Sequence, residues 1–377
     1  MSRSLLVIAG EVSGDMHAAR VVRELQKRDP SMKFWGAGGS GLRECGMEIL
    51  YDVKDMAVMG LAEVLRRYGF FKQTFAHLLD EAVQRKPDAV LLVDYPGFNL
   101  RFAEQAKKAG LKVIYYICPQ VWAWHRSRIK KIAQIVDHLL VIFPFEVDVF
   151  KDTGLRVDFV GHPLAEAEQG TADGIPWQGS PRLALLPGSR RQEIHRILPA
   201  MLGAVELLKK DHPNLSVVVA CPTEQVAGWV NEFSGKRKAL FTVVTGKTRA
   251  VLRSARAALV KSGTSTIEAA LAGCAMVLVY KTSWLTYTLG RLLVRVPHIG
   301  MVNIVAGRRI VPELIQQQAT PKAVAAAVKP LLSHTAAFDK MKQELYEVEK
   351  LMGKGGAAAR AAEMILSDLE RDASCKK

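Results

Sequence analysis

The sequence predicts an α/β protein of two Rossmann-like, doubly wound domains that face a cleft, followed by a helical C-terminal tail. Three observations support this prediction. Short, uniformly apolar segments alternate with amphipathic helical segments along most of the 377 residues. The alternation stops at a polar stretch rich in Gly and Pro, residues 166–181, and then starts again. Strands that are apolar on both faces are typical of parallel sheets covered by helices on both sides.

The first domain, expected at residues 1–165, contains six apolar strand candidates: SLLVIA, KFWG, DAVLLVD, KVIYYI, HLLVIF and DFVG. Helices are expected between them, at residues 15–28, 61–85, 102–109 and 126–135. A strand followed by a helix and another strand is the repeating unit of a parallel sheet. We therefore expect a parallel sheet with helices on both faces.

The second domain, expected at residues 182–333, repeats the pattern with the strand candidates RLALL, SVVVAC, LFTVV, AALV and AMVLVY. Its main helices are expected at residues 194–210, 223–233 and 321–333. The tail, residues 334–377, is expected to form helices at 336–352 and 357–371 that pack back on an N-terminal domain, either its own or that of a partner subunit. Ligands of such folds bind outside the carboxyl ends of the strands, so the interdomain cleft is the expected site.

Composition narrows the class of partner. The chain has 52 Lys and Arg against 37 Asp and Glu, a net charge of +15, which favours a phosphorylated ligand, an anionic membrane or nucleic acid. Its five cysteines are odd in number and widely spaced, which indicates neither a disulfide framework nor a zinc site. The apolar run after MSRS is too short for a signal peptide, and no run approaches a membrane span. A cytoplasmic protein with at most peripheral membrane contact is expected.

Two blocks together predict a nucleotide-sugar site. LALLPGSRRQEI and LVKSGTSTIEAA each run from an apolar strand through a turn of small residues into a helix, whose free N–H groups and dipole favour a diphosphate. Arg190 and Arg191 add positive charge beside the first turn, and Glu268 in the second helix can accept ribose hydroxyls. Either block alone is also compatible with an ordinary capped turn. The candidate contacts are Ser189, Arg190, Ser262, Gly263, Thr264 and Glu268.

A catalytic candidate comes from VDYPGFNLR, where Asp94 ends a very apolar strand. Partial burial at a strand end suits a general base, although Asp94 could instead cap the next helix. In GEVSGD, Ser13 and Asp15 could cap a helix or contact an acceptor phosphate. His17 or His125 could share the proton with Asp94, but a structural role is the usual one for such histidines.

Other motifs argue against cofactors. GAGGSG at residues 36–41 matches a dinucleotide fingerprint, but it does not follow the first strand, and the next helix is cut short by Gly46. GKT at residues 246–248 lacks the first glycine of a phosphate-binding loop. The sequence contains no Asp-x-Asp, no HExxH and no Cys/His cluster. We expect no cofactor and no metal, with arginine and helix termini neutralising the leaving diphosphate.

Aromatic and basic residues occur together in three segments: PQVWAWHRSR, with Trp122 and Trp124, and residues 61–79 and 283–302. Such segments are typical of helices at an anionic lipid surface, and also of ordinary helices that face a core. The first segment could also bind nucleic acid. A basic binding module without catalysis is therefore an alternative from a different functional class.

Nine blocks occur in an order that closely resembles one family. They are AGEVSGD, AVMGLAEVL, VDYPGFNL, PQVWAW, FPFE, FVGHPL, LLPGSR, SGTSTIE and VNIVAGRRIVPEL. In content and order they resemble the lipid-A-disaccharide synthases, glycosyltransferases of lipid A assembly, over almost the whole chain. The chain departs from the family's pattern at Gly97, where many members have a second Asp, and in its longer, more basic tail. No role of that second carboxylate is therefore expected here.

The resemblance implies a GT-B fold and an inverting transfer of 2,3-diacylglucosamine from its UDP derivative to 2,3-diacylglucosamine 1-phosphate, which gives a tetraacyl disaccharide 1-phosphate and UDP. By position, Asp94 matches the general base, Arg190 an arginine near the diphosphate, Glu268 and Asn303 polar groups of the donor site, and Glu11 a required acid. Glu11 and Gly14 share the AGEVSGD motif with Ser13 and Asp15. The resemblance also implies that the protein acts at the inner face of the cytoplasmic membrane and binds no nucleic acid. It further implies a homodimer whose subunits exchange their C-terminal segments.

The alternative within the same fold is another UDP-sugar glycosyltransferase or an epimerase acting on a soluble acceptor. Dependence on acyl chains separates the two. The volume of a pocket, and not a sequence motif, determines which acyl-chain length of the substrates is accepted. The sequence therefore does not predict that length.

Overall fold

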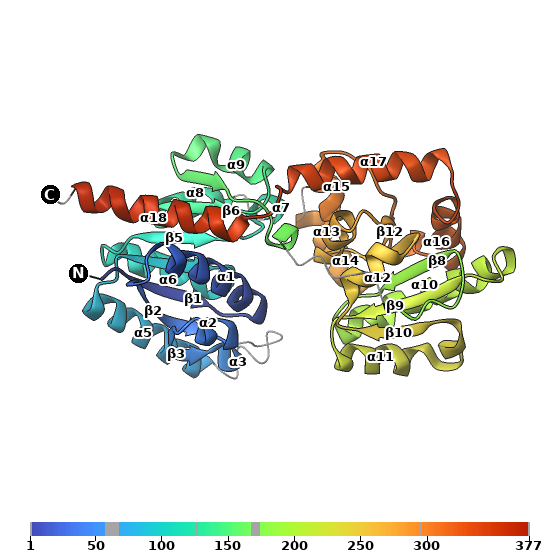
Figure 1. Cartoon of the computed structure of the whole chain (residues 1–377), viewed down its shortest axis with the longest axis horizontal. Coiled ribbons are helices and arrows are strands. Elements are labelled where there is room, and N and C mark those ends of the chain that lie inside the picture. Colours follow the sequence, from blue (N-terminus) through green and yellow to red (C-terminus); the bar gives the residue numbers. More distant parts are fainter. Residues whose placement is uncertain (1, 57–67, 125–126, 167–173, 294–295, 376–377) are drawn as a thin grey trace. The chain divides into compact units, whose positions relative to one another are not determined.

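The computed structural model describes residues 2–56, 68–124, 127–166, 174–293 and 296–375. The chain divides into two compact units, one formed by Met1–Glu166 with Met352–Lys377 and the other by Ala167–Leu351. Each unit contains one parallel sheet with helices on both of its faces (Figure 1). The predicted α/β architecture with two doubly wound domains is confirmed.

The first unit contains a seven-stranded sheet in the order β3-β2-β1-β4-β5-β6-β7. Its strands are β1 (Ser4–Ala9), β2 (Lys33–Gly38), β3 (Glu48–Asp52), β4 (Ala89–Val93), β5 (Val113–Tyr116), β6 (His138–Val141) and β7 (Arg156–Phe159). The order reverses between β1 and β4, so the crevice between these two strands is the topological switch point of the sheet.

Helices join these strands and cover the sheet. They are α1 (Val12–Arg28), α2 (Ser40–Glu44), α3 (Val53–Met56), α5 (Tyr68–Arg85), α6 (Pro96–Lys108), α7 (Val121–Trp124), α8 (Ser127–Ile135), α9 (Phe145–Phe150) and the C-terminal α18 (Ala357–Cys375). The core lies between sheet and helices, where Leu6, Leu92 and Tyr115 from three neighbouring strands pack with Phe98 and Phe102 of α6. The first part of the helix expected at 61–85, with the AVMGLAEVL block, lies outside the described residues.

The second unit contains a six-stranded sheet in the order β10-β9-β8-β11-β12-β13. Its strands are β8 (Arg182–Leu186), β9 (Ser216–Cys221), β10 (Thr242–Thr245), β11 (Ala257–Lys261), β12 (Ala275–Tyr280) and β13 (Glu313–Ile315). Its α-helices are α10 (Arg191–Asp211), α11 (Glu224–Ser234), α12 (Thr248–Ser254), α13 (Thr264–Leu271), α14 (Trp284–Leu293), α15 (Met301–Ala306), α16 (Pro321–Val328) and α17 (Ala336–Leu351). The switch point lies between β8 and β11.

Three expectations need correction. Helix α1 begins at Val12 rather than at residue 15, and α6 begins at Pro96 rather than at residue 102. Proline has its φ angle preset for the first position of a helix, which explains the earlier start of α6. The tail expected at 334–377 is also divided, because α17 packs on α13, α15 and β12 of the second unit while only α18 packs on α1 of the first (Figure 1).

Candidate active site

In the first unit, the loops that follow β1 and β4 begin next to each other at the switch point of the sheet. The two strands are parallel neighbours with Ala9 opposite Val93, so Gly10 and Asp94 follow them at the same edge of the sheet. The ring of Tyr95 covers Gly10 so closely that a Cβ atom there would lie 2.2 Å from a ring carbon. Only glycine fits at this position, because any side chain would displace the ring of Tyr95. We call the turn formed by Asp94 and Tyr95 the Asp94 turn.

The backbone at Asp94 and Tyr95 is held in an uncommon conformation. Both residues have positive φ angles, 50° and 49°, in the left-handed region that non-glycine residues rarely adopt. The Asp94 carbonyl accepts hydrogen bonds from the hydroxyl of Tyr115 at 2.6 Å and from Nδ2 of Asn99 at 2.8 Å. The Asp94 N–H donates to the carbonyl of Tyr116 at 3.0 Å. These bonds fix the main chain and leave the carboxylate for chemistry.

The electrostatic environment makes Asp94 a stronger base than an ordinary aspartate. Burial and, to a smaller extent, the negative charge of Glu11 raise the pKa of Asp94 to about 6, against an opposing effect of the Tyr95 N–H. A carboxylate with this pKa is mostly ionised at pH 7 and still basic enough to take a proton from a hydroxyl group. Burial and the charge of Arg20 lower the pKa of His17 to about 4, so His17 is a weaker base at neutral pH. His125 lies outside the described residues.

The AGEVSGD motif places its residues differently around the start of α1. The side chains of Glu11 and Ser13 are exposed, whereas Gly14 is buried against the end of β4, where a Cβ atom would be in ordinary contact with the Val93 carbonyl at 3.5 Å. Asp15 is buried, and its carboxylate accepts the N–H groups of Gly39 at 2.6 Å, Gly41 at 2.9 Å and Leu42 at 3.2 Å.

Of the two alternatives for Asp15, helix capping and contact with an acceptor phosphate, this arrangement fits the first, because the three N–H groups lie at the start of α2. It also explains the GAGGSG sequence. The backbone N–H groups that would bind a pyrophosphate in a dinucleotide site are occupied here by the carboxylate of Asp15. A Cβ atom at Gly39 would lie 2.9 Å from that carboxylate, so the glycine is needed for the close approach.

The second unit brings the two predicted diphosphate turns together. Strands β8 and β11 are parallel neighbours with Val260 opposite Leu186, so the turn at residues 187–190 and the turn at residues 262–264 lie at one edge of the sheet. We call them the Gly188 turn and the Gly263 turn. Both glycines have positive φ angles, 121° and 142°. Helices α10 and α13 begin directly after these turns and direct their free N–H groups to the same edge.

Polar side chains surround the two turns. Ser189, Arg190 and Thr264 are exposed, and the side chain of Arg190 is 77% accessible, so it is available to an anionic ligand. Glu268 is largely buried, and burial raises its pKa while the charge of Arg249 lowers it in part. Ser262 is buried, and its hydroxyl donates to the carbonyl of Ile299 at 2.7 Å, which attaches the loop before α15 to the Gly263 turn.

Asn303 has a different role from the one expected by position. Its side chain is completely buried, and its Oδ1 accepts the N–H groups of Ile310 at 2.8 Å and Val311 at 3.0 Å. Its Nδ2 donates to the Val311 carbonyl at 3.0 Å and to Glu313 at 2.8 Å. An amide with both atoms committed in this way is not free to contact the donor. Asn303 instead holds the loop between α15 and β13 in place.

Four residues that shape the candidate site were not predicted from the sequence. Tyr115 and Asn99 fix the Asp94 turn, and an ion pair between Lys261 and Glu193 joins the two diphosphate turns at 2.9 Å. Lys261 carried a local signal, because it is a charged residue at the carboxyl end of the apolar strand AALVK. The partners of the other three are set by tertiary packing and leave no local pattern.

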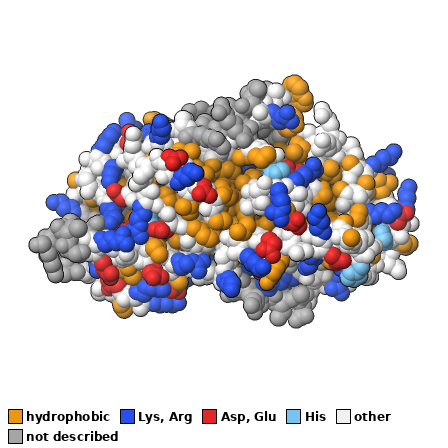
Figure 2. Space-filling model, turned by 90° about the horizontal axis from the view of Figure 1, so that it is seen from above, with side chains coloured by type: hydrophobic (Ala, Val, Ile, Leu, Met, Phe, Trp, Pro, Cys, Tyr) orange, Lys and Arg blue, Asp and Glu red, His pale blue; other side chains and the backbone are white. Residues whose placement is uncertain are grey.

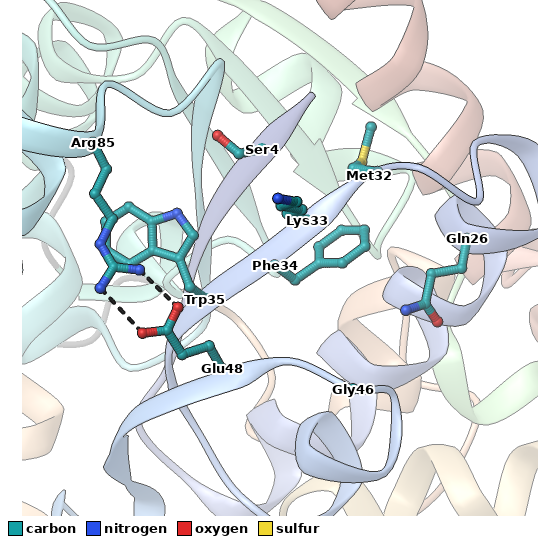
Figure 3. A pocket seen from close by; sticks show the side chains of 9 residues that line it. All are labelled: Ser4, Gln26, Met32, Lys33, Phe34, Trp35, Gly46, Glu48 and Arg85. Atoms are coloured by element: carbon teal, nitrogen blue, oxygen red, sulfur yellow. Dashed lines mark hydrogen bonds and ion pairs between the residues drawn. The ribbon is translucent and has the colours of Figure 1, made fainter. Parts of the chain in front are cut away.

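A cavity of about 490 Å³ lies elsewhere in the first unit (Figure 3). It is lined by Ser4 and Lys33, the first residues of β1 and β2, and therefore lies at the opposite edge of the sheet from Asp94. Its Arg85 is paired with Glu48 at 2.7 and 3.1 Å and lies 4.7 Å from the ring centre of Trp35. Because ligands of doubly wound folds bind at the carboxyl ends of the strands and this cavity lies at the opposite edge, we do not assign the chemistry to it. Within the described ranges, no group of three or more His, Cys, Asp or Glu residues could hold a metal ion.

Comparisons with known proteins give the type of fold and the family. In fold, the chain is similar to UDP-GlcNAc 2-epimerase from Neisseria meningitidis bound to UDP-GlcNAc, with a TM-score of 0.66 and 14% identity over 97% of this chain and 100% of that one. It is also similar to the calicheamicin glycosyltransferase CalG4, with a TM-score of 0.61 and 16% identity over 98% of this chain and 99% of that one. The fold is thus of the GT-B type.

Sequence comparison gives the family. The chain is 44% identical over 374 residues to the lipid-A-disaccharide synthase of Anaeromyxobacter dehalogenans (strain 2CP-C), a match that covers 97% of both proteins. A profile of the lipid-A-disaccharide synthetase family matches residues 5–366. The chain therefore belongs to the lipid-A-disaccharide synthetase family and is a glycosyltransferase that forms a lipid A disaccharide.

Proposed function

We propose that the protein condenses UDP-2,3-diacylglucosamine with 2,3-diacylglucosamine 1-phosphate, with inversion at the anomeric carbon, to give the tetraacyl disaccharide 1-phosphate and UDP. The observation that carries the proposal is the Asp94 carboxylate, held at the switch point of the first unit with its pKa raised to about 6 by burial and Glu11. The two adjacent turns of the second unit supply the matching diphosphate site.

Asp94 acts as the general base. Its carboxylate takes the proton from the 6-hydroxyl of the acceptor as that oxygen forms a bond to the anomeric carbon of the donor. The bond between the anomeric carbon and the β-phosphate oxygen breaks, and its electron pair leaves with UDP. Attack from the face opposite to the leaving group inverts the anomeric centre.

The second unit binds the donor and stabilises the leaving group. The N-terminal N–H groups of α10 and α13 and the guanidinium of Arg190 face the negative charge that grows on the β-phosphate. Ser189, Gly263 and Thr264 line the turns, and Glu268 accepts the ribose hydroxyls. Because these groups carry or stabilise the charge themselves, the mechanism requires no metal ion.

The first unit binds the acceptor. Glu11 and Ser13 are exposed at the start of α1, next to the Asp94 turn, and are the side chains placed to contact the acceptor sugar. Glu11 has a second role, because its charge keeps Asp94 basic.

Both substrates carry acyl chains, so the protein works at the inner face of the cytoplasmic membrane. No helix of the described residues is long and apolar enough to cross a membrane. Exposed aromatic side chains support peripheral contact: Trp284 at the start of α14 is 72% exposed and Tyr68 at the start of α5 is 60% exposed. Lys and Arg side chains are spread over the face shown in Figure 2, which favours an anionic lipid surface.

A homodimer with swapped C-terminal segments is part of the proposal. Helix α18 packs here on the first unit of its own chain, after a connection in which Gly353, Gly355 and Gly356 have positive φ angles. A partner's α18 would make the same contacts if this connection extended. Light scattering after size-exclusion chromatography measures the oligomeric state, and a strictly monomeric active enzyme would contradict this part.

The reaction is tested by UDP release from UDP-2,3-diacylglucosamine in mixed micelles containing EDTA, with and without the acylated acceptor. Acceptor-dependent release that persists in EDTA is expected from the wild type and not from Asp94→Asn. Release with glucosamine 1-phosphate in place of the acylated acceptor would indicate a soluble acceptor. No release with either acceptor from folded wild-type protein would reject the proposal.

A further inference from the structure

An ion pair connects the two diphosphate turns of the second unit. Lys261 is the last residue of β11, and Glu193 lies in the first turn of α10. Their Nζ and Oε1 atoms are 2.9 Å apart, and each side chain is only 19% exposed. The pair therefore connects the end of β11 to α10, the helix that follows the neighbouring strand β8.

The Glu193 carboxylate lies beneath the Gly188 turn. Its Oε1 accepts Lys261 and is also 3.8 Å from Nη1 of Arg190. Its Oε2 is buried, has no hydrogen-bond partner within the described part of the chain, and lies 2.7 Å from where a Cβ atom of Gly188 would be. The single negative charge of Glu193 is thus shared between Lys261 and Arg190, which leaves a net positive charge among these three side chains.

The ammonium of Lys261 lies against the other turn. Its Nζ is 3.4 Å from the position of a Cβ atom at Gly263. The cation is therefore adjacent to the backbone of the Gly263 turn while Glu193 holds it toward the Gly188 turn. An ammonium so held needs little further ordering to meet an anion bound between the two helix N-termini.

We propose that Lys261 is a diphosphate-neutralising residue of the donor site and that Glu193 is the positioning residue that holds it there. The inference depends on the proposed function in one respect: the ligand of the two turns is a nucleoside diphosphate. When the sugar–phosphate bond breaks, the β-phosphate gains one negative charge. The Lys261 ammonium stabilises that charge as a compact cation, while the exposed Arg190 provides a planar donor at the outer side of the turn.

The test measures binding of UDP and of uridine to full-length protein by calorimetry. Lys261→Met is expected to weaken UDP binding by about 10-fold to 100-fold, the usual effect of losing a charge-assisted hydrogen bond, and to leave uridine binding unchanged. Lys261→Arg keeps the charge and is expected to retain most of the affinity. Lys261→Gln provides a second neutral variant if Lys261→Met does not fold.

Lys329→Met is the matched control. Lys329 also forms an ion pair in this unit, with Asp211 at 2.7 Å, but Asp211 is the last residue of the 21-residue helix α10. A helix of that length places Asp211 about 30 Å from the Gly188 turn. Removing this lysine lowers the net charge equally and is expected to leave both affinities unchanged.

The role of Glu193 is tested in the same assay and in steady-state kinetics. Glu193→Gln removes the carboxylate charge that holds Lys261, so kcat is expected to fall about 10-fold with a smaller change in KM. The effect of Lys261→Met on UDP affinity is expected to be smaller in the Glu193→Gln background than in the wild type, because the two residues act as a unit.

Equal loss of UDP and uridine affinity in Lys261→Met would show a structural role and overturn the inference, as would no loss of UDP affinity. Wild-type protein that bound no UDP would overturn the inference and the proposed function together. Wild-type protein that bound UDP through Lys261 but released none with acylated acceptor would overturn the transfer reaction alone.

Discussion

The hydroxyl of Tyr115 donates a 2.6 Å hydrogen bond to the main-chain carbonyl of Asp94, from a ring that is completely buried. Asn99 donates to the same carbonyl. Both bonds act on the backbone of Asp94, the proposed general base, and not on its carboxylate. The fold thereby keeps a strained turn in place without lowering the basicity of the side chain, since donors to the carboxylate itself would lower its pKa.

The first prediction concerns the pH dependence of activity. Because Asp94 must be ionised to accept a proton and its pKa is raised to about 6, kcat/KM is expected to fall about tenfold per pH unit below pH 6. Asp94→Asn is expected to lower kcat by about 10²-fold to 10⁴-fold at pH 7.5. Steady-state kinetics between pH 5 and pH 8.5 measure both effects.

Asp88→Asn provides the control for that experiment. Asp88 precedes the other end of β4, is exposed, and accepts the Ser4 N–H at 2.7 Å. Its substitution is expected to leave the acidic limb of the pH profile in place. An acidic limb that persisted unchanged in Asp94→Asn, with substantial activity, would assign the proton transfer to another group.

The second prediction concerns Glu11. Its negative charge contributes to the raised pKa of Asp94, so Glu11→Gln removes a repulsion and makes Asp94 easier to ionise. The acidic limb of kcat/KM is therefore expected to move to lower pH in this variant, while a role in acceptor binding alone would raise KM and leave the limb where it is. Glu11→Asp keeps the charge and is expected to keep the limb at its wild-type position.

The third prediction concerns stability. A pKa raised from 3.8 to about 6 means that ionised Asp94 destabilises the folded state. This cost is absent below pH 3.8, develops as the pH rises toward 6, and is complete above pH 6. Asp94→Asn is therefore expected to raise the free energy of unfolding by about 2–3 kcal/mol at pH 7.5 and by much less at pH 4.5. Urea unfolding at the two pH values measures it, and an equal gain at both would contradict the electrostatic cause.

The parts of the fold that were predictable are those with a local signal. AVLLV in β4 and the last five residues of β1 are buried throughout, and this continuous apolar character identified both as central strands. The turns at Gly188 and Gly263 were predictable as turns because small residues stand between an apolar strand and a helix, while the anion site expected there stays a prediction. The position of Asp94 directly after a buried strand was predictable in the same way, from a carboxylate at the end of an apolar strand, and its role as general base stays a prediction.

The parts that were not predictable depend on pairings distant in sequence. Asp15 binds a loop 24 to 27 residues later, and Asn303 binds backbone groups and Glu313 up to ten residues later. Asn303 was expected to contact the donor, and contact with an acceptor phosphate was one of two alternatives for Asp15, because a polar residue in a motif carries no sign of whether its partner is a ligand or the protein. Strand β13 has only three residues, too few to show a period in the sequence.

The fourth prediction separates a positioning role of Asn303 from donor contact. Asn303→Asp keeps the shape and the acceptor for Ile310 and Val311 but places a second carboxyl group against Glu313. Two carboxylates this close repel each other when both are ionised. The variant is expected to lose about 2–4 kcal/mol of stability at pH 8 and to recover part of it at pH 5, as one of the two becomes protonated. Stability equal to wild type at pH 8, with weakened UDP binding, would instead place Asn303 in contact with the donor.

The fifth prediction concerns the docking of α18 on the first unit. Asp368 is buried and accepts Nδ1 of His138 at 2.5 Å and the guanidinium of Arg156. Burial alone would raise the pKa of Asp368, but His138, Arg156 and Lys112 outweigh it, so the pKa is lowered. The stabilisation is therefore present above the ordinary pKa of an aspartate and is lost only as the pH falls below it.

Asp368→Ala leaves His138 buried without this partner, so it is expected to destabilise the docked helix by about 3 kcal/mol at pH 7. Limited proteolysis in the connection at residues 353–356 and hydrogen exchange of the α18 amides measure its release. Glu363→Ala on the same helix is the control: Glu363 is exposed, so its loss is expected to change stability by less than about 0.5 kcal/mol. Similar protection of α18 in both variants would show that apolar packing on α1, and not the buried ion cluster, holds the helix in place.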